Sequence, residues 1–184
     1  MIRWLLWIAG GALMGGIVHL ATVLYMPASA TQDAYTRIAA ISPVNAMAQL
    51  AAPTSDNTVV PFMDPAFASA VCRYDLGAGP LRLRVPVSPA YTSVSFYTRK
   101  GVAYYAINDR AAGRRQIELE LMTKAQRATL TDGEETAADR LIVESPGPTG
   151  LIVLRALAPE PGMMEAAQAA LAAARCEIQN APAR

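Results

Sequence analysis

The chain has 184 residues, and its 16 lysine and arginine residues nearly balance its 15 aspartate and glutamate residues, for a formal net charge of +1. The two signs are interspersed, and no basic stripe interleaved with aromatic residues is present, so we expect no nucleic-acid partner. The single histidine, His19, lies in an apolar N-terminal segment. The rest of the chain therefore has neither a Ser-His-Asp triad nor a histidine-ligated zinc site, and we expect no catalytic residue, metal or cofactor.

The N-terminal segment is long enough to cross a membrane. No formal charge occurs between Arg3 and Asp33, and most of this interval, 4–26, is apolar. At ~1.5 Å rise per residue, a helix over 4–26 spans a hydrocarbon core of ~30 Å. Arg3 and the amino terminus lie on the short side of this helix. The positive-inside rule therefore predicts a single-pass membrane protein with a cytoplasmic N-terminus and with the chain after Met26 across the membrane.

A cleaved signal peptide is the alternative reading of the same segment. Ala28-Ser29-Ala30 is an A-x-A cleavage triplet in a suitable place. The apolar run is longer than the ~7–15 residues of a typical signal peptide, which favours an uncleaved anchor in the lipid bilayer. Both readings export the same domain.

Small residues in the apolar segment suggest contact with a second helix. Gly11 and Gly15 have the G-x-x-x-G spacing that permits close approach of two helices, so a homodimer in lipid is one interpretation. Glycine is common in membrane helices in any case, and the spacing alone leaves both interpretations open.

Beyond the anchor, the hydrophobic pattern predicts a mainly β (α+β) domain. We expect a cytoplasmic N-terminus (1–3), a transmembrane helix (4–26), a membrane-proximal helical or loop segment (27–60) and a periplasmic β-rich domain (61–184). Alternating or β-branched runs predict strands over 81–87, 91–98, 102–107, 116–121, 141–144 and 151–157. Capping signals and helical spacing predict helices over 31–41, 64–71, 123–130 and 165–176, and a helical turn over 45–50. About six strands in consecutive hairpins indicate an antiparallel β-sandwich-like domain with a few short helices.

One polar cluster near the middle of the domain is the candidate ligand site. Tyr97, Tyr105, Asn108, Asp109 and Arg110 follow one another across two predicted strands and the turn after them. An aspartate beside an arginine in a loop can bind a carboxylate or a hydroxyl, and tyrosines can line a pocket. The alternative is structural: Asn108 and Asp109 make Asx-turns, Arg110 is solvated, and the tyrosines belong to the core.

Two cysteines, Cys72 and Cys176, lie beyond the anchor. If the domain is exported, they meet an oxidising compartment in which paired thiols usually form a disulfide. Such a bridge would close a loop of roughly 100 residues and stabilise the fold by at most ~4.7 kcal/mol in the chain-entropy model. The alternative is two separate buried thiols.

Several segments resemble one protein family. They are 64–76, Ser93–Tyr97, Tyr105–Arg110, Val153–Leu157 and Ala174–Cys176. Together they are similar to short membrane-anchored proteins of the domain-of-unknown-function 1254 family in alphaproteobacteria. Longer members of that family carry a second β-rich domain of unknown function, and short members are often accompanied by a separate protein that carries it. The resemblance therefore implies a β-sandwich and a possible hetero-partner, and it implies no reaction and no catalytic residue.

Two functions follow from these observations. The anchor, the balanced charge and the aromatic strands favour an interaction module without enzymatic activity. The alternative is a periplasmic domain that binds a small molecule, or a weak hydrolase, with a pocket near Tyr97, Tyr105, Asn108, Asp109 and Arg110.

Overall fold

The structure is a computed structural model, and it describes residues 1–29, 34–54, 60, 63–112, 115–129 and 141–179. The chain divides into two compact units, Met1–Asp33 and Ala34–Arg184, which we describe separately. The first three residues of the helix expected over 31–41 and the last residue of the Ala28-Ser29-Ala30 triplet lie outside the described residues.

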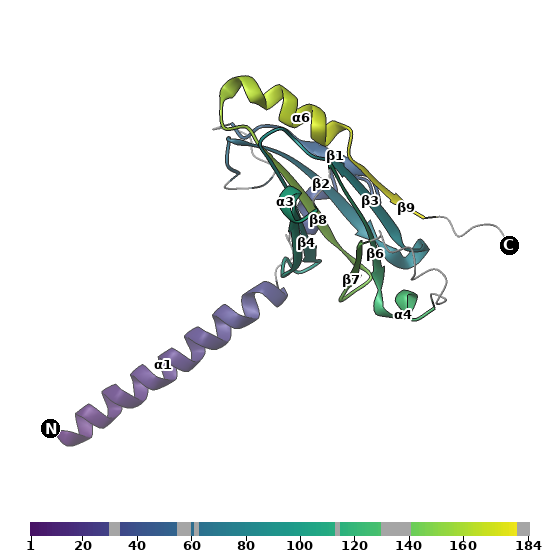
Figure 1. The fold of residues 1–184 in the computed structure, drawn as a ribbon. Helices are drawn as coiled ribbons and strands as arrows, with labels where there is room; N and C mark the ends of the chain where they lie inside the picture. Colours follow the sequence, from purple (N-terminus) through teal and green to yellow (C-terminus); the bar gives the residue numbers. More distant parts are fainter. Residues whose placement is uncertain (30–33, 55–59, 61–62, 113–114, 130–140, 180–184) are drawn as a thin grey trace. The chain divides into compact units, whose positions relative to one another are not determined.

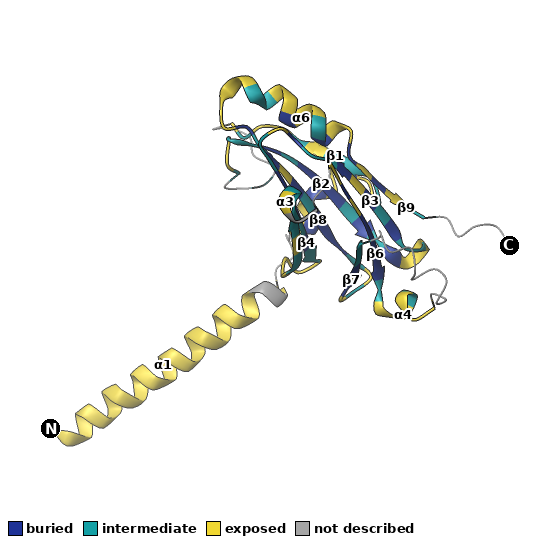
Figure 2. Ribbon diagram, viewed as in Figure 1, coloured by how far each residue is buried: buried dark blue, intermediate teal, exposed yellow. Residues whose placement is uncertain are grey.

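The first unit contains one helix, α1 (Ile2–Ser29). Its stretch Ile2–Met26 is long and apolar enough to cross a membrane, and none of it is buried inside the structure. Figure 2 shows these residues exposed along the length of the helix. A signal sequence near an N-terminus can meet the same criteria of length and composition, so the finding is an apolar helix of membrane-spanning length.

The second unit is built of two β-sheets (Figure 1). Sheet A runs in the order β1 (Met47–Leu50), β2 (Phe67–Asp75), β8 (Thr149–Leu157), β4 (Tyr91–Thr98) and β5 (Ala103–Asn108), and all its pairs are antiparallel. Sheet B runs in the order β7 (Leu141–Ser145), β6 (Gln116–Thr123), β3 (Leu81–Pro86) and β9 (Arg175–Ile178). In sheet B the β6–β7 pair is parallel and the other two pairs are antiparallel.

Helices occupy the connections and one side of the sandwich. The helix α6 (Met164–Ala172) packs against β2 and β8 of sheet A and β3 of sheet B, and it buries Ala167 and Leu171. The remaining short elements are α2 (Ala34–Ile38), η1 (Leu76–Ala78), α3 (Asp109–Ala112), α4 (Lys124–Arg127) and η2 (Pro161–Met163).

The core lies between the two sheets and follows the alternation of the strands. In β3, Leu83 and Val85 are fully buried, while Arg82 and Arg84 point to the outer face. From sheet A, alternate residues of β2, β8 and β4 enter the same apolar cluster, among them Ile152. Side chains two residues apart share a face of a strand, so this pattern fixes which face of each strand is buried.

A disulfide joins the two sheets. Cys72 of β2 and Cys176 of β9 are bonded, with Cα atoms 6.5 Å apart and a sequence separation of 104 residues. Both residues are almost completely buried. The structure therefore contains the pairing expected from the sequence.

The two packed sheets and the apolar N-terminal helix confirm the expected fold class. The expected connectivity through consecutive hairpins is right for β4 and β5. It is wrong for the other strands, because β2 pairs with β8, β3 lies between β6 and β9, and β6 and β7 are parallel. Alternation in a strand shows which face is buried, but it carries no information on which strand lies beside it.

Two expected helical segments are strands in the structure, and a third helix ends earlier than expected. The segment 64–71 was expected to be a helix because Asp64-Pro65 is a favoured helix start, yet most of it belongs to β2. The Asp64 carboxylate instead accepts a hydrogen bond from the Ala66 N–H, at 2.9 Å, in a turn before the strand. A cap contributes only ~1 kcal/mol, which is less than the burial of a central strand between β1 and β8.

The other two corrections concern short strands at the edges of the sheets. The helical turn expected over 45–50 is wrong, since Met47–Leu50 is the edge strand β1. The last helix ends at Ala172, so Cys176 lies on β9 and not at the end of a helix. In both cases a short segment satisfies its backbone hydrogen bonds by joining an existing sheet, which local helix propensity does not reveal.

Candidate functional site

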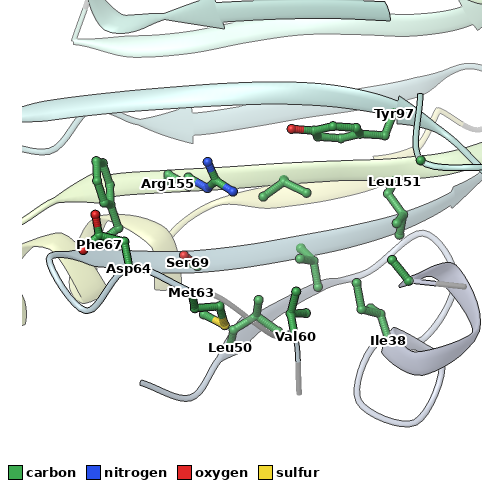
Figure 3. A pocket seen from close by; sticks show the side chains of 14 residues that line it. Ile38, Leu50, Val60, Met63, Asp64, Phe67, Ser69, Tyr97, Leu151 and Arg155 are labelled. Atoms are coloured by element: carbon green, nitrogen blue, oxygen red, sulfur yellow. The ribbon is translucent and has the colours of Figure 1, made fainter. Parts of the chain in front are cut away.

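The outer face of sheet A carries a cleft of about 340 Å³. It is roofed by Ala34 and Ile38 of α2, by Leu50 of β1 and by Val60 and Met63, and its floor is formed by β2, β8 and the end of β4 (Figure 3). The lining residues are Ala34, Ile38, Leu50, Val60, Met63, Asp64, Phe67, Ser69, Val71, Tyr97, Gly101, Leu151, Val153 and Arg155. This volume lies at the lower end of the ~300–1,000 Å³ range that is typical of small-molecule pockets.

The cleft is apolar because both of its sides present aliphatic side chains. Val71 and Leu151 on the sheet pack with Ile38 and Tyr35 of α2 in a second, smaller apolar cluster, separate from the core between the sheets. The strands β2 and β8 thus present apolar side chains on their outer faces as well as on their inner faces, which is the pattern of strands covered on both sides. The described roof leaves part of this apolar surface uncovered, and that part is the cleft.

Two arginines hold α2 on the sheet. The Arg73 guanidinium lies 4.4 Å from the ring centroid of Tyr35, and the Arg99 guanidinium lies 5.1 Å from the same centroid. Arg73 also donates a hydrogen bond to the Ser42 carbonyl, at 3.2 Å. Cation–π contacts of this kind contribute ~0.5–1 kcal/mol or more each, so they fix the wall of the cleft that contains Ile38.

A second fixed point follows α2. Asn45 has a backbone φ of +58° and bonds Asp75 through both ends of its side-chain amide: Nδ2 donates to the Asp75 carbonyl at 3.0 Å, and Oδ1 accepts from the Asp75 N–H at 2.8 Å. Asparagine tolerates this left-handed conformation better than most residues. The chain therefore enters β1 in a defined position beside the cleft.

One polar row crosses the apolar floor of the cleft. The register places Ser69 opposite Arg155, Arg155 opposite Ser93, and Ser93 opposite Asn108. Directly paired residues on neighbouring strands point to the same side of the sheet, with Cβ atoms ~4.5–5.5 Å apart. Ser69 and Arg155 line the cleft, while Ser93 and Asn108 continue the row beyond it. Among the described residues, Arg155 has no ion pair or hydrogen bond.

The structure does not bring the five sequence-predicted site residues together. Tyr97 lines the cleft, and Asn108 lies on the same face at the far end of the polar row. Tyr105 packs inside the sandwich against Phe96, with ring centroids 5.8 Å apart. Asp109 and Arg110 open α3, and neither lines the cleft.

A β-bulge explains the position of the tyrosines. The β4–β5 register shifts between Phe96 and Tyr97, so that Phe96 pairs with Tyr105 and Tyr97 pairs with Ala103. Tyr104 is the extra residue of the bulge, and both Tyr104 and Tyr105 therefore pack against the core on the side of Phe96. Strict alternation would have placed one of them on the outer face.

Tyr104 belongs to a buried hydroxyl network inside the sandwich. The Tyr74 hydroxyl lies 3.0 Å from the Tyr104 hydroxyl and 3.0 Å from Ser145 Oγ. Burial raises the pKa of Tyr104 well above its usual value, and its hydrogen bond with Tyr74 raises it further. Among the described residues that line the cleft, only Tyr97 contacts this network, through a hydrogen bond from the Tyr74 hydroxyl to the Tyr97 backbone carbonyl. We therefore interpret the network as structural.

On the outer face of sheet B, Arg82 and Arg84 lie on one face of β3, and both donate to one carboxylate oxygen of Glu118. The hydrogen bond from Arg82, together with that from Arg84, holds the pKa of Glu118 below its usual range. These two arginines and Glu118 are therefore already paired with one another. Within the described residues no group of three or more His, Cys, Asp or Glu side chains is arranged to hold a metal ion.

Sequence reasoning missed Arg155, the central polar residue of the cleft. A signal was present: Arg155 is the only charged residue in the predicted strand 151–157, which is otherwise apolar. A lone charge in a strand that is apolar on both faces marks a place where one face is not fully covered.

The fold and the cleft define a two-sheet β-sandwich with a roofed apolar cleft on one outer face. The family model described as "Protein of unknown function (DUF1254)" matches residues 44–177, so the chain belongs to the DUF1254 family. This match confirms the resemblance at the level of the family. No curated protein matches the chain in sequence.

Two solved structures are similar in fold. The crystal structure of the VPA0106 protein from Vibrio parahaemolyticus has 13% sequence identity and a TM-score of 0.58, over 82% of this chain and 37% of that chain. An uncharacterised protein from Burkholderia cenocepacia has 15% identity and a TM-score of 0.49, over 82% of this chain and 42% of that chain. The chain thus spans less than half the length of either protein. The first similarity supports the fold alone.

Proposed function

We propose that the protein is a membrane-anchored binding domain that takes a small apolar ligand in the cleft on the outer face of sheet A. The observation that carries this proposal is the cleft itself, about 340 Å³ in volume and lined mainly by aliphatic and aromatic side chains. Burial of apolar surface supplies binding energy, and the few polar groups in such a site orient the ligand.

The fixed wall of the cleft indicates a preformed binding site and not a transient gap in the packing. Arg73 and Arg99 hold Tyr35 of α2, and the Asn45 side chain holds the chain beyond it. A preformed site loses less conformational freedom when the ligand binds, and so retains more of the interaction energy. The described lining of the cleft contains no histidine and one carboxylate, Asp64, which accepts a hydrogen bond from the Ala66 N–H, so binding is better supported than hydrolysis.

Photolabelling tests this function on the full chain in membrane vesicles. We expect a photoreactive, uncharged dodecanol to label peptides from β2 and β8 saturably, with competition by unlabelled dodecanol. Val153→Trp places an indole on the cleft floor and should abolish this labelling. Ile142→Trp, a matched change at a half-exposed position of β7 in sheet B, should leave it unchanged. Equal labelling of wild type and Val153→Trp would rule out the cleft.

We also propose that α1 is an uncleaved anchor in a bacterial inner membrane, with the β-sandwich in the periplasm. The protein would then be of the short, membrane-anchored type within its family. The length of Ile2–Met26 and the position of Arg3 support this topology. A reporter that is active only in the periplasm, fused after Arg184, should be active. Activity of a cytoplasmic reporter at the same position would reverse the topology, and loss of α1 from the mature protein would identify a signal peptide.

A hetero-partner is a second proposal, supported by the length of a protein of similar fold. The matched region covers 37% of the VPA0106 chain, so that chain has room for a further domain. We propose that this protein binds a separate chain that carries the companion β-rich domain. Mild solubilisation and pull-down should recover such a chain in stoichiometric amount; recovery of this chain alone, or of a homodimer through Gly11 and Gly15, would contradict the proposal.

A further inference from the structure

This inference rests on the proposed binding cleft. We propose that its ligand is an amphipathic acid, with an alkyl chain on the apolar floor and a carboxylate bound by Arg155. The ligand class follows from one cation, two flanking hydroxyl groups and an apolar floor on the same face of sheet A.

The cation is Arg155, on β8 in the middle of sheet A. Its guanidinium lines the cleft and has no ion pair or hydrogen bond among the described residues. The carboxylate of Asp64 also lines the cleft, but it accepts a hydrogen bond from the Ala66 N–H at 2.9 Å and forms no ion pair with Arg155. Arg155 is therefore free to bind an anion from solution. A guanidinium binds a carboxylate through two parallel hydrogen bonds.

Two hydroxyl groups flank this cation in the register. Ser69 of β2 and Ser93 of β4 are the direct partners of Arg155 on either side. Their hydroxyls can donate to an oxygen that Arg155 holds, because paired side chains on one face lie within ~4.5–5.5 Å at Cβ. A neutral apolar ligand would make no use of this polar row.

The apolar floor extends from Arg155 in one direction. The next row of residues on the outer face contains Val71 and Val153. The row after that contains Leu151, which packs with Ile38 of α2. Figure 3 shows Arg155 and Ser69 in one part of the cleft, and Leu151 and Ile38 at its other end. Leu151 lies four residues from Arg155, or ~13 Å along the strand, which suits a single extended alkyl chain.

Competing head groups predict different behaviour. An alcohol would bind through the floor alone and would be indifferent to the charge at residue 155. A phosphate would depend on the charge as a carboxylate does, but would bind at lower concentration than a carboxylate of equal chain length. The experiment therefore compares photoreactive dodecanoate, dodecanol and dodecyl phosphate on the full chain in membrane vesicles, with the β6 peptide of sheet B as background.

The expected results follow from the ion pair. Wild type should be half-labelled in β2 and β8 at about tenfold lower concentration of dodecanoate than of dodecanol. Arg155→Gln should raise the concentration of dodecanoate needed for half-labelling about tenfold and leave that of dodecanol unchanged. Arg155→Lys should keep most of the preference for dodecanoate over dodecanol. Arg84→Gln, a matched change on the outer face of sheet B, should alter neither probe.

Other outcomes separate the two proposals. An unchanged response to dodecanoate in Arg155→Gln would overturn the head-group assignment, and so would an equal loss of both probes, while binding of dodecanol would leave the cleft standing. A lower half-labelling concentration for dodecyl phosphate than for dodecanoate would overturn the assignment of a carboxylate head group to the ligand. Absence of label in β2 and β8 with every probe would overturn the binding cleft, and this inference with it.

Discussion

At the scale of single residues, Gly150 of β8 has a role that only the packing reveals. A Cβ built on Gly150 would overlap the Tyr74 hydroxyl and the Tyr97 carbonyl oxygen. The hydrogen of glycine therefore allows the hydroxyl network to approach the strand. Its φ lies outside the left-handed region, so close approach and not backbone conformation is the constraint.

We predict that Gly150→Ala lowers the free energy of unfolding by about 1–3 kcal/mol, the usual range for overpacking. The matched control is Gly147→Ala, because a Cβ at Gly147 meets no atom within 4 Å. Urea unfolding of the two variants, followed by near-ultraviolet circular dichroism, measures the difference. Equal stability of the two variants would show that the close approach at Gly150 is wrong.

The buried hydroxyl of Tyr104 predicts a dependence on alkaline pH. Burial raises its pKa in the folded state, whereas a tyrosine in the unfolded chain ionises at about pH 10. Above about pH 10 the unfolded state therefore binds fewer protons than the folded state, and stability falls as pH rises, by up to ~1.4 kcal/mol per pH unit. Below this pH the contribution is fully present.

Tyr104→Phe should remove this part of the alkaline loss. Urea unfolding between about pH 9 and pH 11 should show a shallower fall in stability for Tyr104→Phe than for wild type. Tyr105→Phe removes a neighbouring hydroxyl that is outside the network, and it should keep the wild-type slope. An unchanged slope in Tyr104→Phe would show that this hydroxyl is not buried in solution.

At the scale of elements, the sequence predicts where the strands lie better than it predicts which strands pair with one another. The alternation in 81–87 and 116–121 identifies β3 and β6 because each strand buries one face. The capping box that begins α4 at Thr123 is also visible in the sequence, because its hydrogen bonds are local. The segment 64–71 could not be assigned correctly, because the partners that make it a strand, β1 and β8, come from distant parts of the chain.

The candidate site follows the same rule. Tyr97 and Asn108 could be singled out from their residue types, but the bulge at Tyr104 that turns Tyr105 inward depends on the pairing of β4 with β5. The polar row through Arg155 joins strands that are distant in the chain and becomes visible only with the register. Sequence reasoning therefore found single residues of the outer face and missed the arrangement that makes the cleft.

The disulfide is the main covalent link between the two sheets in the described chain. Because Cys72 and Cys176 lie 104 residues apart, the bond restricts a large part of the unfolded chain. We predict that Cys72→Ala/Cys176→Ala lowers the free energy of unfolding by about 2–5 kcal/mol. Reduced wild-type protein should show the same loss in urea unfolding. Free labelling of both thiols in folded protein from its native compartment would contradict the bond.

At the scale of the whole molecule, the chain consists of two compact units. The apolar helix α1 has the length of a membrane anchor, and the β-sandwich encloses its own core and disulfide. The cleft is on the outer face of sheet A, so a ligand can enter without opening the core between the sheets. We therefore expect binding to leave the core packing unchanged.

The most direct measurement uses the methionine methyl groups of the full chain in lipid nanodiscs. Met63 lines the cleft, whereas Met122 is buried on β6 of sheet B. In a titration with dodecanol, followed by carbon-13 methyl nuclear magnetic resonance, the Met63 resonance should shift saturably and the Met122 resonance should stay in place. The shift should be lost in Val153→Trp. A Met63 resonance that does not move, or that moves equally in Val153→Trp, would contradict ligand binding in the cleft.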